Sequence, residues 1–112
     1  MQGVVNENAT QRVRVEWSNA RQSNPVHVGG INRRFHLELP DSFTGTEITY
    51  EVRNAAGDWI PLHDGGLVHQ DTVAATTAAL CLLDADALAG LTEFRILSDQ
   101  AETCVGWLHC SA

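Results

Sequence analysis

Five histidines are the first residues in this sequence that could do chemistry, because imidazole binds metals and transfers protons near neutral pH. His63, beside Asp64, and His69 could supply metal ligands from two neighbouring strands. None of the compact spacings typical of a metal site, such as CxxC or HExxH, is present. His36 alternates with charged residues on what we expect to be an exposed face. The sequence therefore predicts no metal site, and we interpret the histidines as surface polar groups and turn partners.

Nucleophilic and paired-acid catalysis also lack a recognisable arrangement. Serine, threonine and cysteine are present, but no GxSxG turn or other local motif places one beside a base. Glu47 and Glu51 share one face of a predicted strand, where a carboxylate pair is normally solvated rather than catalytic. We therefore expect that the protein is not an enzyme, with no catalytic residue and no cofactor.

The three cysteines, Cys81, Cys104 and Cys110, are an odd number and do not form a disulfide framework. Cys104 and Cys110 would lie about 20 Å apart on one face of a strand, too far to bond to each other. Cys81 could bridge one of them only from an adjacent strand. We expect three reduced, core-filling thiols. The first residues do not have the pattern of a signal peptide, so synthesis in a reducing bacterial cytoplasm is expected.

Composition excludes several classes of protein. The 112 residues are 44% hydrophobic and 19% charged, which is typical of one globular domain. Seven basic residues, all arginine, stand against 14 acidic ones, so the formal net charge is -7. A dominant nucleic-acid-binding role needs a basic face and is not expected. No apolar run reaches the roughly 20 residues of a membrane span.

Alternation of apolar and polar residues predicts the strands that must position any site. It is clearest at 34–39 and at 47–53, and the short loop between these two segments suggests that they pair as antiparallel neighbours. Asp84 as N-cap and Gly90 after the last residue predict one helical turn. Residues 73–83 are compatible with a helix or a strand, and we interpret them as a strand or as a loop leading into one at 79–83. The other predicted strands are 13–17, 26–28, 59–62, 67–69, 94–96 and 104–110.

These elements predict an all-β fold, an antiparallel β-sandwich of the jelly-roll or Ig-like kind. It would contain about seven or eight short strands and one helical turn near residues 84–90. Residues 1–30 are assigned to an N-terminal arm and the first strands, and 31–112 to the β-sandwich, within a single domain overall.

Apolar residues that a small sandwich leaves uncovered predict an interaction surface. The last predicted strand is apolar on both faces, a pattern typical of a strand that is covered on both sides. Trp59, between a turn and Pro61, is the best candidate for an exposed aromatic contact. The candidate interface residues are Val13, Val15, Trp17, Trp59, Val105 and Trp107.

Four segments carry a resemblance to a known group of proteins. Residues 37–52 read LELPDSFTGTEITYEV, 56–64 read AGDWIPLHD, 73–75 read VAA, and 88–98 read LAGLTEFRILS. In this order they resemble small virion-associated β-sandwich proteins of tailed phages and phage-like particles such as gene transfer agents. The resemblance spans 34–110, and it rests on turns and strands rather than on catalytic residues.

The resemblance implies a structural virion accessory protein of the head-decoration, head-spike or tail type. Its partners would be capsid, spike or tail subunits, it would form a homo-oligomer, and it would be located in the virion. The sequence departs from the family pattern at His63, where a tyrosine is usual, and at 90–92. The alternative is a carbohydrate-binding module that holds a host-surface glycan on Trp59, Tyr50 and neighbouring aspartates.

Overall fold

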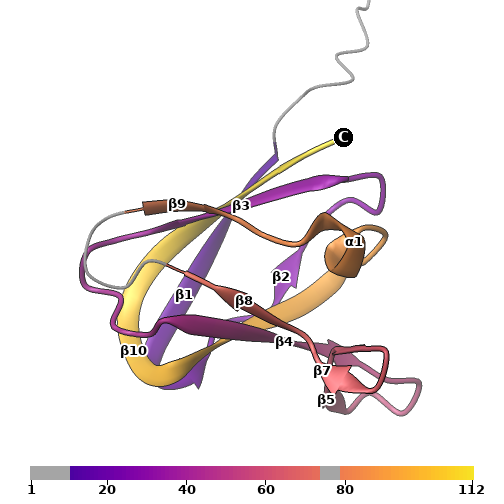
Figure 1. The fold of residues 1–112 in the computed structure, drawn as a ribbon, viewed down its shortest axis with the longest axis horizontal. Coiled ribbons are helices and arrows are strands. Elements are labelled where there is room, and N and C mark those ends of the chain that lie inside the picture. Colours follow the sequence, from indigo (N-terminus) through magenta and orange to yellow (C-terminus); the bar gives the residue numbers. More distant parts are fainter. Residues whose placement is uncertain (1–10, 74–78) are drawn as a thin grey trace, which may run out of the picture.

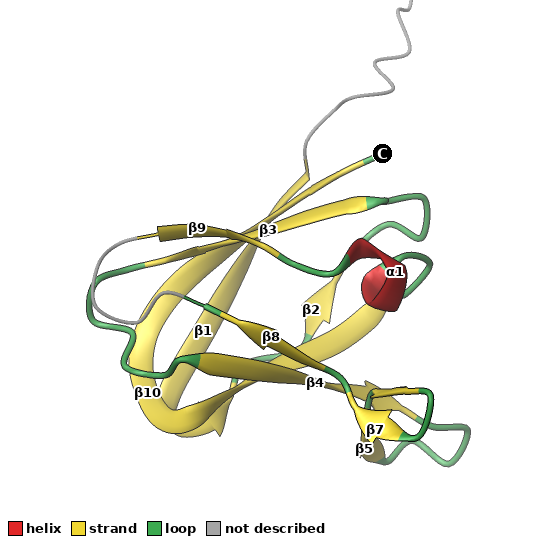
Figure 2. Ribbon diagram, in the orientation of Figure 1, coloured by secondary structure: helices red, strands yellow, loops and turns green. Residues whose placement is uncertain are grey.

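The computed structural model describes residues 11–73 and 79–112, and it confirms the predicted all-β, antiparallel, sandwich-like fold (Figures 1 and 2). Within these ranges there are ten strands rather than seven or eight, because the turn-rich stretch 63–72 forms three very short ones. The elements are β1 (Gln11–Gln22), β2 (Val26–His27), β3 (Arg34–Leu39), β4 (Glu47–Arg53), β5 (Trp59–Pro61), β6 (His63–Asp64), β7 (Leu67–Val68), β8 (Gln70–Thr72), β9 (Ala79–Leu82), α1 (Ala85–Leu88) and β10 (Glu93–Ser111).

The long strand β10 organises the fold, because it bends and belongs to both layers of the sandwich (Figure 1). Its first half pairs with β4, with Arg95 opposite Glu51, and β5 and β8 extend this layer beyond β4. Its second half pairs with β3, with Trp107 opposite Glu38, and β9 extends that layer beyond β3. Along its other edge β10 pairs with β1 over most of its length.

The predicted pairing of 34–39 with 47–53 is wrong, because β10 lies between β3 and β4 in the sheet order. The connection 40–46 does not close a hairpin and carries the chain from one layer to the other. Phe43 in this connection is only 1% exposed, so it anchors the crossing in the core.

The first strands expected within residues 1–30 are β1 and β2, and both pair with β10 in the sheet. β1 also continues through residues 18–22, beyond the end of the strand predicted at 13–17. It does so through an irregularity at Asn19, which has a φ of 53° and whose N–H donates to Thr103 Oγ1 at 3.1 Å. Residues 1–10 of the predicted arm lie outside the described residues.

The alternation in the sequence places the core residues correctly. Phe35, Leu37 and Leu39 on β3 are at most 1% exposed, and Ile48 and Tyr50 on β4 are fully buried. β10 adds apolar side chains to the core from both of its halves, namely Phe94, Ile96, Leu108 and Cys110.

The helical turn is confirmed as α1. The carboxylate of Asp84 accepts a hydrogen bond from the Asp86 N–H at 2.9 Å, and Gly90 has the positive φ of 87° expected just after the helix. Leu88 is fully buried. The strand expected near 79–83 is confirmed as β9, and residues 74–78 lie outside the described residues.

A buried carboxylate holds the bend of β10 against the crossing connection. Glu102 is 2% exposed and accepts hydrogen bonds from the N–H groups of Thr44 and Gly45 at 2.9 and 2.8 Å. The hydroxyl of Ser98 donates to the same carboxylate at 2.7 Å. Charge-assisted hydrogen bonds of this kind are among the strongest in proteins, so they fix the corner that joins the two layers.

A second carboxylate, Asp99, holds the same connection from the solvent side. Its Oδ1 accepts from the N–H of Thr46 at 3.0 Å and of Glu47 at 3.4 Å. Slight burial raises the pKa of Asp99, but the hydrogen bonds from these backbone N–H groups outweigh it and leave the pKa below its usual value.

Candidate functional site

The outer face of the layer formed by β1, β10, β3 and β9 carries three exposed large apolar side chains. We call it the outer face. The strand register sets its side chains in cross-strand rows, and one row runs from Arg14 through Trp107 and Glu38 to Leu80. The next row runs through His109 and His36 to Leu82.

Three large apolar side chains of the outer face lie open to solvent. Leu82 is 69% exposed, Leu80 is 60% exposed and Trp107 is 37% exposed, while Val105 is half-buried. Exposed side chains of this size gathered on one sheet layer are typical of a protein–protein contact.

The charge of the outer face differs from that of the whole chain. It carries the exposed arginines Arg12, Arg14 and Arg34 against the carboxylates Glu16 and Glu38, a formal sum of +1 in a chain of net charge -7. An acidic partner therefore meets less repulsion at this face than the net charge of the whole chain suggests.

A shallow hollow of about 300 Å³ lies on this face, lined by Arg34, His36, Leu80 and His109 among others. Nε2 of His109 lies 2.8 Å from a carboxylate oxygen of Glu38. Cys110 and Ser111 also line the hollow, but Cys110 is fully buried and neither side chain is hydrogen-bonded to His36 or His109, so the hollow is best described as part of a contact surface.

The other layer presents a contrasting outer surface around Trp59. The guanidinium groups of Arg53 and Arg95 lie 4.3 and 4.7 Å from the centre of its ring. Arg95 Nε also donates to Glu51 at 2.6 Å, and Arg53 Nε lies 3.2 Å from Glu93. Trp59 is thus half-buried, with two paired guanidinium groups over its ring.

The six candidate interface residues separate into three groups. Val15 and Trp17 are at most 1% exposed and lie in the core, because the inward face of β1 is covered by both layers, so they are not surface residues. Val13 is half-buried against the core, and Trp59 is covered as described. Val105 and Trp107 do lie on the outer face.

The sequence did not single out Leu80 and Leu82. The available signal was the stretch Ala79–Leu82, which is apolar at every position and so leaves one of its faces uncovered unless a second layer packs there. β9 is the last strand in its layer, and no other described element covers its outer side.

Tyr50, Asp71 and His69 form a group of titratable side chains in the interior. The Tyr50 hydroxyl donates to Asp71 Oδ2 at 2.7 Å, and His69 Nε2 lies 3.2 Å from the same oxygen. Burial, and then this hydrogen bond, raise the pKa of Tyr50 far above its ordinary value. Because both partners converge on one carboxylate and Tyr50 is fully buried, the group joins β4 to β8 and presents no nucleophile to a substrate.

The side chains considered as metal ligands, His63 beside Asp64, and His69, do not point to a common site. His63 is exposed and directs Nδ1 to the Pro61 carbonyl at 3.1 Å, whereas His69 is buried beside Asp71. Residues 11–73 and 79–112 contain no group of three or more histidine, cysteine, aspartate or glutamate side chains that could hold a metal ion.

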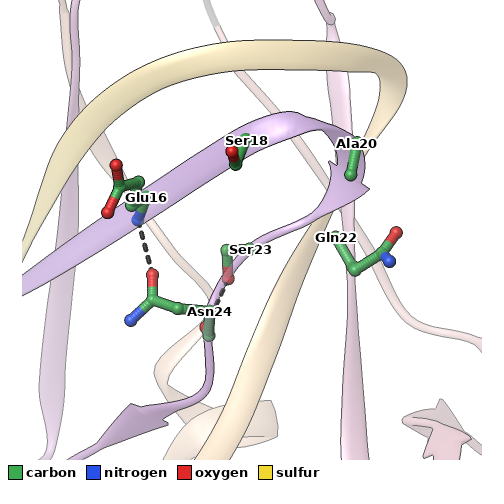
Figure 3. Close-up of a pocket in the computed structure, with 6 residues that line it drawn as sticks. All are labelled: Glu16, Ser18, Ala20, Gln22, Ser23 and Asn24. Atoms are coloured by element: carbon green, nitrogen blue, oxygen red, sulfur yellow. Dashed lines mark hydrogen bonds between the residues drawn. The ribbon is translucent and has the colours of Figure 1, made fainter.

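A polar hollow of about 290 Å³ lies where β1 bends, and Figure 3 shows the side chains that line it. Asn24 reaches back to β1, where its Oδ1 accepts from the Glu16 N–H at 2.6 Å. The Asn24 N–H in turn donates to the Glu16 carbonyl at 3.0 Å. Asn24 thus covers part of the β1 edge at this hollow. Glu16 is the single ionisable side chain in the lining, so the hollow does not assemble a catalytic group.

All three cysteines are free, as expected. Burial raises the pKa of both Cys104 and Cys110 to about 11. A second, weaker contribution at Cys104 comes from the charge of Glu102. These two thiols are therefore poor nucleophiles near neutral pH.

The described residues contain no helix with the length and hydropathy needed to cross a membrane. Comparison with known protein families, with curated proteins and with solved structures gave no match to this chain.

Proposed function

We propose that this chain is a structural accessory protein of a tailed phage or phage-like particle, which attaches non-covalently to capsid, spike or tail subunits. The observation that carries the proposal is the outer face, where Trp107, Leu80 and Leu82 lie open on a sheet layer. It would be made in the bacterial cytoplasm, incorporated into the virion, and present there as a homo-oligomer.

The resemblance to small virion proteins supports this proposal through the parts of the chain that it involves. Its most distinctive segment includes 44–46, whose N–H groups bind the buried Glu102 and the exposed Asp99. Its second segment includes Trp59 and Pro61, which lie in the edge strand β5. The shared residues thus serve the architecture, as expected for proteins related by a structural role.

The residues named for glycan binding do not favour the alternative function. Tyr50 is fully buried, and Trp59 lies beneath two guanidinium groups. A sugar needs an open aromatic face for stacking; Tyr50 has none, and on Trp59 a sugar would compete with the two guanidinium groups.

Purification of particles from cells that encode the chain tests the proposal. We expect the chain to co-sediment with particles through a density gradient, to be missing from particles made after deletion of its gene, and to rebind those particles saturably. A chain that stays in the soluble fraction and does not rebind would overturn the proposal. Trp107→Glu on the outer face should abolish rebinding, and Leu67→Glu, at an exposed site on β7 away from the outer face, is its matched control for surface charge.

A further inference from the structure

We propose that the free edge of β9 is a two-fold contact through which a second copy of this chain extends the sheet. The inference rests on the self-association included in the proposed function, and it does not depend on attachment to a particle. It starts from the directions of the backbone groups of β9.

The hydrogen-bond pattern shows which residues of β9 face outward. The Leu83 N–H donates to the Phe35 carbonyl at 2.9 Å, so this pair lies at a hydrogen-bonded position of the β3–β9 ladder. Hydrogen-bonded and non-hydrogen-bonded pairs alternate along an antiparallel ladder. The backbone N–H and C=O groups of Cys81 are therefore hydrogen-bonded to the backbone of Leu37. The backbone N–H and C=O groups of Leu80 and Leu82 point away from β3.

No described residue accepts from or donates to those outward groups of Leu80 and Leu82. The side chains of the same two leucines are 60% and 69% exposed. An edge that offers free backbone groups together with exposed apolar side chains is a ready template for another strand.

Other edges of the large sheet carry protection that β9 lacks. β5 contains Pro61, which has no N–H, and β8 contains the charged Asp71. The edge of β1 is closed by Asn24 and by a bridge between Trp17 and Ser23. β9 has no proline, no charge and no cap.

A second copy fits this edge in one self-complementary register. An antiparallel contact that pairs Leu80 with Leu82 of the partner subunit also pairs Leu82 with the partner's Leu80, as two-fold symmetry requires. Both pairs fall at hydrogen-bonded positions, so all four outward groups of each copy are satisfied. Four leucines then gather on one side of the continuous sheet.

Charge also favours a second copy at this edge. The chain has a net charge of -7, so two copies repel each other over most of their surface. Ala79–Leu82 contains no ionisable group except the Cys81 thiol. The two strands therefore meet without placing like charges opposite each other.

Analytical ultracentrifugation of the full chain in reducing buffer tests the contact. We expect a concentration-dependent dimer, with a dissociation constant that rises about thirtyfold in Leu80→Pro, because two hydrogen bonds are lost per dimer. Leu82→Lys, an independent variant, should weaken the dimer as well by placing a charge in the leucine cluster. Near-UV circular dichroism establishes that each variant is folded.

Trp107→Glu is the matched control, since it changes the same face two strands away from the edge. We expect its dimer to be unchanged. A wild-type chain that stays monomeric at high micromolar concentration, or folded Leu80→Pro and Leu82→Lys variants that dimerise normally, would overturn the inference. A wild-type chain that dimerises but does not rebind particles would count against the proposed attachment and leave the β9 contact standing.

Cross-linking reports the register. In a variant that retains Cys81 but carries Cys104→Ser and Cys110→Ala, the proposed axis passes between Cys81 and the partner's Cys81, so a short bis-maleimide should join the two copies. Addition of Leu80→Pro to this background should abolish the cross-link. Because Cys81 is half-buried against the core, its labelling by a mono-functional maleimide is measured first; a dimer whose Cys81 thiols are labelled but are never joined would exclude this register.

Discussion

The two outer surfaces of the sandwich each present one tryptophan, and the surroundings of the two differ. Trp59 lies beneath Arg53 and Arg95, which are themselves paired with carboxylates. Trp107 is 37% exposed in the layer whose edge carries Leu80 and Leu82. The comparison indicates that the surface around Trp59 contributes to the stability of the chain, whereas the outer face is available for contacts with other molecules.

The corner at Glu102 joins the two layers that carry these surfaces. A change there should destabilise both layers together, so the difference between their two outer surfaces should be lost. In Gly45→Ala a new Cβ would collide with Ser98 Oγ and Asp99 Oδ1 and displace the carboxylates from their N–H partners. We expect the free energy of unfolding to fall by about 4 kcal/mol, with association lost as well. Urea denaturation followed by tryptophan fluorescence measures the loss, and a fall below about 1 kcal/mol would contradict the role of the corner.

Glu102→Gln tests the same corner through its charge alone. The amide keeps the size of the side chain but has one acceptor oxygen where the carboxylate has two, and its NH₂ group faces other donors. We expect a loss of about 3 kcal/mol in the free energy of unfolding. The second variant, Glu102→Asp, keeps the charge but is one methylene shorter, so a smaller loss there would confirm that charge-assisted bonds dominate.

Trp59→Ala sharpens the comparison from the stabilised side. The change removes two cation–π contacts and a half-buried ring, so we expect about 2 kcal/mol less stability and no effect on self-association. Thermal unfolding and sedimentation of the same sample measure the two quantities. Weaker association without a change in stability would reverse the assignment of the two surfaces.

Acid should produce the smallest effect, through Asp99. Its pKa is lowered in the folded chain from an ordinary 3.8, so its ionised form contributes stability above that pH, and the contribution is lost as the pH falls through the folded pKa. Asp99→Asn should cost on the order of 0.5 kcal/mol at neutral pH, because the group is exposed. The difference in unfolding free energy between the variant and the wild type should shrink in strong acid. A difference that does not depend on pH would show that ionisation of Asp99 is not the cause.

The sequence predicts the local features of this fold well, because they depend on neighbouring residues. The alternation at 34–39 and 47–53 predicted which side chains are buried, and Asp84 and Gly90 predicted the helical turn. The pairing of strands depends on distant residues and was not predicted. The polar stretch between Ser98 and Thr103 looked like a loop between two strands, yet it is the bend of one strand, held by Glu102.

The candidate site was predicted only in part for the same reason. Trp17, Trp59 and Trp107 are chemically equivalent in the sequence, and their exposure is set by residues from other strands. Phe43 packs edge-to-face against Trp17 at 5.3 Å, and Arg95, which is distant from Trp59 in the sequence, covers that ring. Trp107 stays exposed because the described part of the chain supplies no third layer.

Rebinding of purified chain to particles that lack it tests the central claim most directly, with the Trp107→Glu and Trp59→Ala variants compared side by side. If the outer face is the attachment surface, the wild type and folded Trp59→Ala should bind saturably. Folded Trp107→Glu should not bind. Equal binding by Trp107→Glu and the wild type would contradict it.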